Sequence, residues 1–343
     1  MTTAIVVTNG FDGTWPFAAD YARARWSKES NLTFFRLPPG QACDIAKLGL
    51  PADVSRLLLL GCELPVDCLP EFPKLREVGF ATRVVPDSPL AIAARERNIQ
   101  LYGRLSEGYW GQSLAEFALG LTICGLRRIP QLHHAILSSI QPWDFSPPAG
   151  VATPGARGAQ FGDDVNFANG TIAGKRVRIA GLGNIGSRYA AFCNFLGANV
   201  AAWDPIAQES VFHRTGAHRV SRLIDLARDA DIFVPMMPLL DATRGVISRE
   251  VIDALPKGAL MVVTTRMKIC DPDAIRRRVL ADEIALAADV FDVEPLPLYD
   301  ELLGRHNVVH TPHNAGRTIH ANHSLIDMIL DQFEKTDPAA ALV

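Results

Sequence analysis

The sequence predicts an α/β fold with two lobes, each built on a parallel β-sheet. Three features predict it: the length of the chain, its alternation of short apolar runs with helical stretches, and a long segment rich in proline and glycine near its middle. The chain has 343 residues, more than the roughly 250 to 300 at which a single hydrophobic core stops growing. We therefore expect two domains.

The first lobe begins with short apolar runs, which we interpret as strands, separated by helical stretches. Strands are predicted at Ile5–Val7, Leu57–Leu60 and Gln100–Tyr102, and a helix at Leu90–Arg97. This alternation is typical of stacked β-α units. We expect the lobe to comprise residues 1–112 together with 317–343, because a last helical stretch, His320–Lys335, can cross back to it.

A long helix and an extended connection follow the first lobe. The residues from Ser113 to Glu116 form a capping-box pattern, in which the serine hydroxyl and the glutamate carboxylate satisfy free amides at a helix start. This pattern predicts a helix from Ser113 to about Ser139. The segment Gln141–Gly170 is longer than the usual connection inside a domain. It is interpreted either as a surface excursion or as an arm that reaches a partner subunit.

The second lobe, residues 113–316, shows the more regular alternation. Apolar runs predict strands at Val177–Ala180, Val200–Trp203, Ile232–Val234, Leu260–Thr264, Ile284–Asp289 and Val308–Thr311. Helical periodicity predicts helices at Ile185–Leu196, Ser221–Ala230, Arg249–Leu255 and Pro272–Ala281. Near-continuous apolar strands with intervening helices indicate a doubly wound parallel sheet.

Composition excludes several classes of function. A formal net charge of −3 offers no electrostatic footprint for nucleic acid or an anionic membrane surface. The scattered cysteines form neither metal-binding pairs nor a disulfide framework, so we expect all six to be reduced thiols: Cys43, Cys62, Cys68, Cys124, Cys193 and Cys270. Neither a signal-like nor a membrane-spanning segment is evident, so a cytoplasmic location is expected.

A glycine-rich motif follows the first strand of the second lobe. Gly181, Gly183 and Gly186 have the spacing of the dinucleotide fingerprint, in which they allow a tight turn, close approach to a pyrophosphate and close helix packing. Asp204 follows eighteen residues after Gly186, where a carboxylate binds ribose hydroxyls and repels a 2'-phosphate, which favours NAD over NADP. The alternative is a glycine-rich turn that holds no nucleotide.

Several pieces of the chain, in this order, resemble the D-isomer-specific 2-hydroxyacid dehydrogenases. This family includes phosphoglycerate, glycerate and D-lactate dehydrogenases and glyoxylate/hydroxypyruvate reductases. The pieces are Leu114–Glu116, Gly181–Gly186, Trp203–Pro205, Met237–Thr243, Arg266, Asp289–Pro295 and Thr311–Gly316, within a resemblance from about Gly79 to Thr318. The resemblance implies two Rossmann- or flavodoxin-like lobes, a cofactor in the cleft between them, and a homodimer.

The resemblance also implies a catalytic set that suits the reduction of a 2-oxo acid. That reaction needs a proton donor, a cation for the carboxylate and an aligned hydride. His313 is the implied acid/base, Glu294 its partner, and Arg266 the residue that binds the substrate carboxylate in a fork. Alone, each has a structural alternative: a histidine in a turn, a surface glutamate, and an arginine at a strand end.

Further site residues follow from the same resemblance. Those implied to bind the cofactor are Gly181, Gly183, Asn184, Ile185, Gly186, Asp204, Met237, Thr264, Thr265, Arg266, Asp289, His313 and Gly316, and those implied to bind the substrate are Gly79, Phe80, Arg266 and His313. Met237, Thr264, Thr265 and Asp289 are assigned to the nicotinamide half of the pocket. No metal site is expected, because His306, His310, His320 and His323 lack ligand spacing.

The sequence departs from the family pattern in two loops. Val263 and Met267 stand where the family has asparagine and glycine, so we expect a shifted loop around Arg266 rather than a strained one. In the first lobe Phe80 is expected to narrow or reshape the small-residue loop that holds the substrate carboxylate. Tyr109 and Trp110, with Arg83 and Arg104, are interpreted either as cleft residues or as packing and surface charge.

Two other functions remain open. A dinucleotide-sensing scaffold resembling the C-terminal-binding corepressors shares this fold and can retain Arg266, Glu294 and His313. A formate or phosphite dehydrogenase is a third interpretation, although the distinctive additional segments of those families are not evident.

Overall fold

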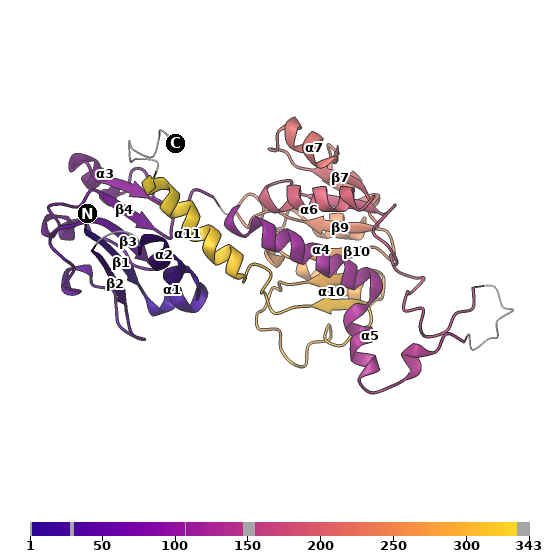
Figure 1. The fold of residues 1–343 in the computed structure, drawn as a ribbon. Coiled ribbons are helices and arrows are strands. Elements are labelled where there is room, and N and C mark those ends of the chain that lie inside the picture. Colours follow the sequence, from indigo (N-terminus) through magenta and orange to yellow (C-terminus); the bar gives the residue numbers. More distant parts are fainter. Residues whose placement is uncertain (1, 28–30, 107, 147–154, 335–343) are drawn as a thin grey trace. The chain divides into compact units, whose positions relative to one another are not determined.

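The computed structural model describes residues 2–27, 31–106, 108–146 and 155–334 (Figure 1). The chain forms two compact units: unit 1 is Met1–Trp110 with Arg317–Val343, and unit 2 is Gly111–Gly316. The first boundary lies two residues before the one expected from the sequence. No helix in the described ranges is long and apolar enough to cross a membrane.

Unit 1 contains a parallel five-stranded sheet in the order β2-β1-β3-β4-β5. Its strands are β1 (Thr2–Val7), β2 (Leu32–Arg36), β3 (Val54–Leu60), β4 (Glu77–Phe80) and β5 (Gln100–Tyr102). The sequence prediction lacked β2 and β4. The half-buried edge strand β2 has no long apolar run, and the short β4 contains a glycine, so neither carries a strong strand pattern.

Helices cover both faces of this sheet: α1 (Asn9–Thr14), α2 (Ala18–Trp26), α3 (Pro89–Glu96) and α11 (Ile319–Glu334), with 3₁₀ turns η1 (Ile45–Lys47), η2 (Val66–Glu71) and η3 (Gly108–Trp110). On one face, Leu325, Ile329 and Phe333 of α11 pack with Ile5 and Leu58 of the strands. The C-terminal helix therefore completes the core of unit 1 (Figure 1).

Strand β4 corrects the expectation for the small-residue loop at Phe80. Phe80 is the last residue of β4, and its side chain is buried in the core with Leu57 and Leu59. Phe80 therefore fills the core instead of narrowing a substrate loop. Gly79 faces α11, where an added Cβ would lie 2.8 Å from Cε2 of Phe333. Only glycine allows the helix to approach the strand this closely.

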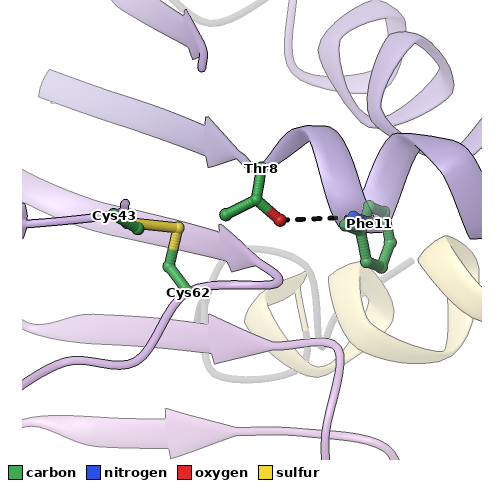
Figure 2. Close-up of a disulfide and its surroundings, with 4 residues drawn as sticks. All are labelled: Thr8, Phe11, Cys43 and Cys62. Atoms are coloured by element: carbon green, nitrogen blue, oxygen red, sulfur yellow. Dashed lines mark hydrogen bonds between the residues drawn. A yellow bond between two sulfur atoms is a disulfide. The ribbon is translucent and has the colours of Figure 1, made fainter. Parts of the chain in front are cut away.

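Two of the six cysteines form a disulfide, which corrects the prediction that all six are reduced. Cys43 is bonded to Cys62, which follows β3 (Figure 2). The partners are 19 residues apart in the chain, and sequence spacing alone cannot show which distant side chains meet. The other four are free; burial raises the pKa of the Cys193 thiol to about 12 and also raises that of Cys270, so these two are poor nucleophiles.

Unit 2 contains a parallel seven-stranded sheet in the order β12-β11-β10-β9-β6-β7-β8. Its strands are β6 (Arg176–Ala180), β7 (Asn199–Trp203), β8 (His218–Arg219), β9 (Ile232–Pro235), β10 (Leu260–Val263), β11 (Ala285–Ala288) and β12 (Val308–His310). The strand order reverses at β6, so the crevice outside the ends of β6 and β9 is the expected ligand position of a doubly wound sheet.

Helices also cover both faces of the second sheet. They are α4 (Gly111–Arg127), α5 (Ile129–Ile136), α6 (Asn184–Phe195), α7 (Glu209–Thr215), α8 (Leu223–Arg228), α9 (Arg249–Asp253) and α10 (Pro272–Leu280), with 3₁₀ turns η4 (Gln141–Trp143) and η5 (Met267–Ile269). One core joins α4, α6 and α7 to the sheet, and the other joins α8, α9 and α10 to it. The prediction lacked α7 and the two-residue β8.

The long helix predicted from Ser113 to Ser139 is wrong at both ends. Helix α4 begins at Gly111, which places Ser113 inside it; Glu116 accepts a hydrogen bond from Gln112 Nε2 at 2.6 Å, so the pattern is not the predicted cap. The helix ends before Arg128, which has a left-handed φ of 52°. A second helix, α5, starts directly after it, because Pro130 tolerates only a first helical turn.

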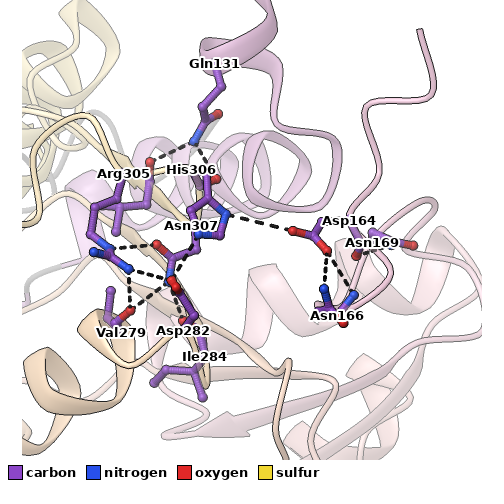
Figure 3. A network of polar contacts seen from close by, with 11 residues as sticks. Gln131, Asp164, Asn166, Asn169, Val279, Asp282, Ile284, Arg305, His306 and Asn307 are labelled. Atoms are coloured by element: carbon purple, nitrogen blue, oxygen red, sulfur yellow. Dashed lines mark hydrogen bonds and ion pairs between the residues drawn. The ribbon is translucent and has the colours of Figure 1, made fainter. Parts of the chain in front are cut away.

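The end of the predicted excursion packs on its own unit. The Ala168 amide donates to Gly258 O at 2.7 Å, and His306 lies between Asp282 (3.0 Å) and Asp164 (3.9 Å) (Figure 3). This half of the segment is therefore a surface excursion over the sheet. Residues 147–154, in its middle, lie outside the described residues.

Candidate active site

The glycine motif forms a tight turn between β6 and α6. Gly181 has a φ of 102°, and an added Cβ on Gly186 would lie 2.0 Å from Gly181 O, so the turn requires glycine at both positions. Nothing lies within 4 Å of a Cβ built on Gly183, the residue before the first turn of α6. The open backbone at Gly183 and the amides of Asn184 and Ile185 suit a pyrophosphate.

Asp204 follows β7 and braces the turn around it. Its Oδ2 accepts from the Leu182 amide at 2.7 Å, and its Oδ1 accepts from the amides of Ile206 (2.8 Å) and Ala207 (2.9 Å). A carboxylate has about four acceptor positions, so about one remains for a ribose hydroxyl. Asp204 therefore also has a structural role, because its hydrogen bond to the Leu182 amide connects the glycine turn to the end of β7.

The ends of β9 and β10 carry the side chains assigned to the nicotinamide. Met237 follows β9 and touches the glycine turn: a Cβ on Gly181 would lie 2.8 Å from its Cγ. Thr264 and Thr265 follow β10 and are buried. The Thr264 hydroxyl is buried without a hydrogen-bond partner among the described residues. Such an atom indicates a group that the protein itself does not supply, which fits a bound cofactor.

Arg266 is exposed and directly precedes the 3₁₀ turn η5. Its Nη1 donates to Thr265 O at 2.7 Å, and its φ of −149° is extended. Met267 is buried in the core, and it is not among the described residues with positive φ. The loop therefore accommodates methionine in place of glycine without backbone strain, as expected.

His313 and Glu294 form a hydrogen-bonded pair. The His313 Nδ1 donates to Glu294 Oε2 at 2.7 Å, while the Phe291 amide donates to Glu294 Oε1 at 2.7 Å. Burial raises the pKa of the Glu294 carboxyl, but these hydrogen bonds and the charges of His313 and Arg266 lower it more, so the net pKa is below its usual value. The charge of Arg266 makes the smallest of these contributions.

Asp289 supports the turn that carries His313. It is fully buried; its Oδ1 accepts from Thr311 Oγ1 (2.6 Å) and the Asn314 amide (3.0 Å), and its Oδ2 accepts from the Ala315 amide (2.9 Å). His313 itself has a φ of 53°, a conformation that needs support from its surroundings. Sequence reasoning assigned Asp289 to the nicotinamide and missed this contact set, because it joins residues more than twenty positions apart.

Replacing Asp289 with alanine should destabilise unit 2. The substitution leaves a hydroxyl and two amides of the turn without their acceptor, which predicts a loss of about 3 kcal/mol in the free energy of unfolding. Urea denaturation followed by circular dichroism measures it. The exposed Asp292, mutated to alanine, is the matched control. Equal stability of the two variants would contradict the supporting role.

The structure brings most of the predicted site residues to one edge of the unit 2 sheet. These residues, which follow β6, β7, β9, β10, β11 and β12, are Gly181, Gly183, Asn184, Ile185, Gly186, Asp204, Met237, Thr264, Thr265, Arg266, Asp289, Glu294, His313 and Gly316. Gly79 and Phe80 belong to unit 1. Tyr109 is buried against Trp15 and Trp110 and accepts a hydrogen bond from Arg104, which favours the packing interpretation.

Comparison with known proteins shows which family this chain resembles. Residues 155–315 match the model of the D-isomer specific 2-hydroxyacid dehydrogenase NAD-binding domain. A glyoxylate/hydroxypyruvate reductase of Arabidopsis thaliana is 30% identical over 271 residues, which cover 78% of this chain and 75% of that protein. The chain belongs to the D-isomer-specific 2-hydroxyacid dehydrogenases. The glycine turn, Asp204 and Thr264 therefore lie in the NAD-binding domain of this family.

One further relative matches in sequence, and one solved structure matches in fold. A D-3-phosphoglycerate dehydrogenase of Methanocaldococcus jannaschii is 28% identical; the match covers 80% of this chain but only 48% of that relative, so the chain spans about half of its length. An NAD-complexed D-isomer specific 2-hydroxyacid dehydrogenase of Lactobacillus delbrueckii subsp. bulgaricus superposes with a TM-score of 0.70 at 20% identity, covering 97% of this chain and 96% of that one.

Proposed function

We propose that this chain is an NAD-dependent oxidoreductase that transfers a hydride between the nicotinamide and a 2-oxo or 2-hydroxy acid. The observation that carries the proposal is the His313–Glu294 hydrogen bond, at the same edge of the unit 2 sheet as Arg266, which follows β10. A proton carrier and a cation near one another are the two groups that reduction of a 2-oxo acid requires from the protein.

The cofactor residues hold NAD through the backbone and through buried side chains. Gly183 and the first amides of α6 receive the pyrophosphate, Asp204 receives the ribose, and Met237, Thr264 and Thr265 line the nicotinamide end. Bound NAD supplies the hydride acceptor or donor.

The acid/base step belongs to His313. Its Nδ1 is held by Glu294, so Nε2 is the nitrogen left to donate a proton to the carbonyl oxygen or to take one from the hydroxyl. The ionised Glu294 fixes this tautomer and stabilises the imidazolium that forms during oxidation. Asp289 keeps the turn in place beneath the histidine.

Arg266 binds the substrate carboxylate. In the described structure its guanidinium donates to a carbonyl of its own loop, and its remaining N–H groups can form a planar fork with a carboxylate. The positive charge also polarises the adjacent carbonyl. Gly79 and Phe80, which the family resemblance implies to bind the substrate, lie in β4 and are paired within the unit 1 sheet.

A panel of substrates tests the proposal. Purified protein with NADH and glyoxylate, hydroxypyruvate, pyruvate or phenylpyruvate is expected to consume NADH, measured by its absorbance. Turnover of formate or phosphite with NAD instead would support the other dehydrogenase classes. Tight NADH binding without turnover of any acid would contradict the enzyme and favour the dinucleotide-sensing scaffold.

We also propose a homodimer and a cytoplasmic location. Large apolar side chains are exposed on α5 and the segment after it, which supports an interface between copies: Ile129, Ile136, Leu137, Ile140, Trp143 and Phe145. Light scattering measures the oligomer, and a monomer would contradict the proposal.

The free thiols support the cytoplasmic location. The Cys43–Cys62 bond counts against it, because disulfides are rare in the cytoplasm. Cell fractionation measures the location.

A further inference from the structure

The turn after β7 is clamped by an arginine from the neighbouring strand. Arg219 is the last residue of β8, which pairs with β7. Its Nη1 donates to Asp204 O at 3.2 Å and its Nη2 to Ala207 O at 2.8 Å. The guanidinium lies 3.8 Å above the ring of Phe212. It is therefore a cation held against the backbone of the turn that carries Asp204.

Glu209 holds the third nitrogen of this guanidinium. The Arg219 Nε donates to Glu209 Oε2 at 3.0 Å, so each of the three guanidinium nitrogens is engaged by the protein. The Glu209 side chain is 79% exposed and that of Arg219 is 36% exposed. Since an exposed ion pair contributes little to stability, Glu209 is not needed to hold the fold at this position.

We propose that Glu209 is a second determinant of dinucleotide selectivity, acting through Arg219. NADP differs from NAD by a 2'-phosphate on the adenosine ribose, and a nearby arginine is the group that accommodates that phosphate in NADP-binding sites. Here Arg219 contacts the backbone of Asp204, the residue assigned to the ribose, but Glu209 neutralises the arginine and holds it in place. A 2'-phosphate at this position would therefore meet the Asp204 and Glu209 carboxylates, while the Arg219 guanidinium is already engaged by the protein.

Removing the Asp204 carboxylate and removing the Glu209 carboxylate should have different consequences. Asp204 accepts from three backbone amides, so removing it also loosens the glycine turn. Removing the Glu209 charge leaves those contacts in place and removes the negative charge that neutralises Arg219. The interaction of two unit charges about 4 Å apart is about 1 kcal/mol in water, which corresponds to about a fivefold change in Kd. Because a negative charge is removed, this change in binding free energy favours NADPH, the dinucleotide with the 2'-phosphate.

Binding measurements on Glu209→Gln test the inference, which rests on NAD binding by unit 2. Fluorescence or calorimetric titration at low salt should show the Kd of NADPH falling about fivefold or more, with that of NADH changing little. The double variant Glu209→Gln/Arg219→Gln should lose the gain, because the cation that supplies it is gone.

The control is a variant that removes one negative charge far from this turn in the sequence. Asp253→Asn removes the same charge from an aspartate that pairs with Arg277 rather than with the turn, and it should leave the NADPH Kd unchanged. An unchanged NADPH Kd in Glu209→Gln, or a gain that persists without Arg219, overturns the inference while NADH binding leaves the proposed function intact. If the unmutated protein binds neither dinucleotide, the proposed function fails as well.

Discussion

Replacing His313 with alanine is expected to lower kcat for 2-oxo acid reduction by about 10²- to 10⁴-fold, the usual contribution of a general acid. The substitution removes the proton donor and leaves Glu294 with the Phe291 amide as its remaining partner. Because His313 is exposed at a turn rather than part of a core, the glycine turn and the buried threonines should still bind NADH. Stopped-flow kinetics and NADH titration measure the two effects separately.

The control for this variant is the neighbouring histidine. His310 is exposed at the end of β12, and His310→Ala should retain the kcat of the unmutated protein. If His313→Ala retained full turnover, the assigned mechanism would be wrong. If it lost NADH binding and turnover in equal measure, His313 would support the cofactor rather than the proton transfer.

The second large effect is expected from Arg266→Lys. Lysine retains the charge but loses the planar fork, so we expect kcat/KM for the 2-oxo acid to fall by about 10²- to 10³-fold, the scale found when one charge-stabilising donor is removed. Both a higher KM and a lower kcat should contribute, because the guanidinium binds the carboxylate and polarises the carbonyl. Steady-state kinetics over a range of acid concentrations measure both.

An arginine outside the predicted site provides the comparison. Arg249 is exposed and faces Asp271 at 3.7 Å, so Arg249→Lys should leave kcat/KM unchanged. A short carboxylate such as glyoxylate should lose as much as a long one, because Arg266 acts on the group that all 2-oxo acids share. Normal kinetics of Arg266→Lys would place the carboxylate site elsewhere.

The strands that carry the site were predictable from the sequence because their signals are local. In unit 2 each site residue follows a buried apolar run, and parallel strands bring their carboxyl ends to one edge of the sheet. The glycine spacing at Gly181–Gly186 predicted the turn for a similar reason: glycine alone tolerates both a φ of 102° and the contact at Gly186. Weak local patterns hid the short strands β2, β4 and β8.

The tertiary structure decided what depends on contacts between distant segments. Asp289 under the His313 turn, Arg219 between Asp204 and Glu209, and the Cys43–Cys62 bond each join residues that no local pattern connects. Apolar periodicity and glycine spacing are properties of a few consecutive residues, so the sequence by itself determined the strands that carry the site in unit 2, the glycine turn and the order of the site residues. Hydrogen bonds and ion pairs across the fold form only once packing brings their atoms within about 3 Å, so the folded chain alone decided which groups support the site.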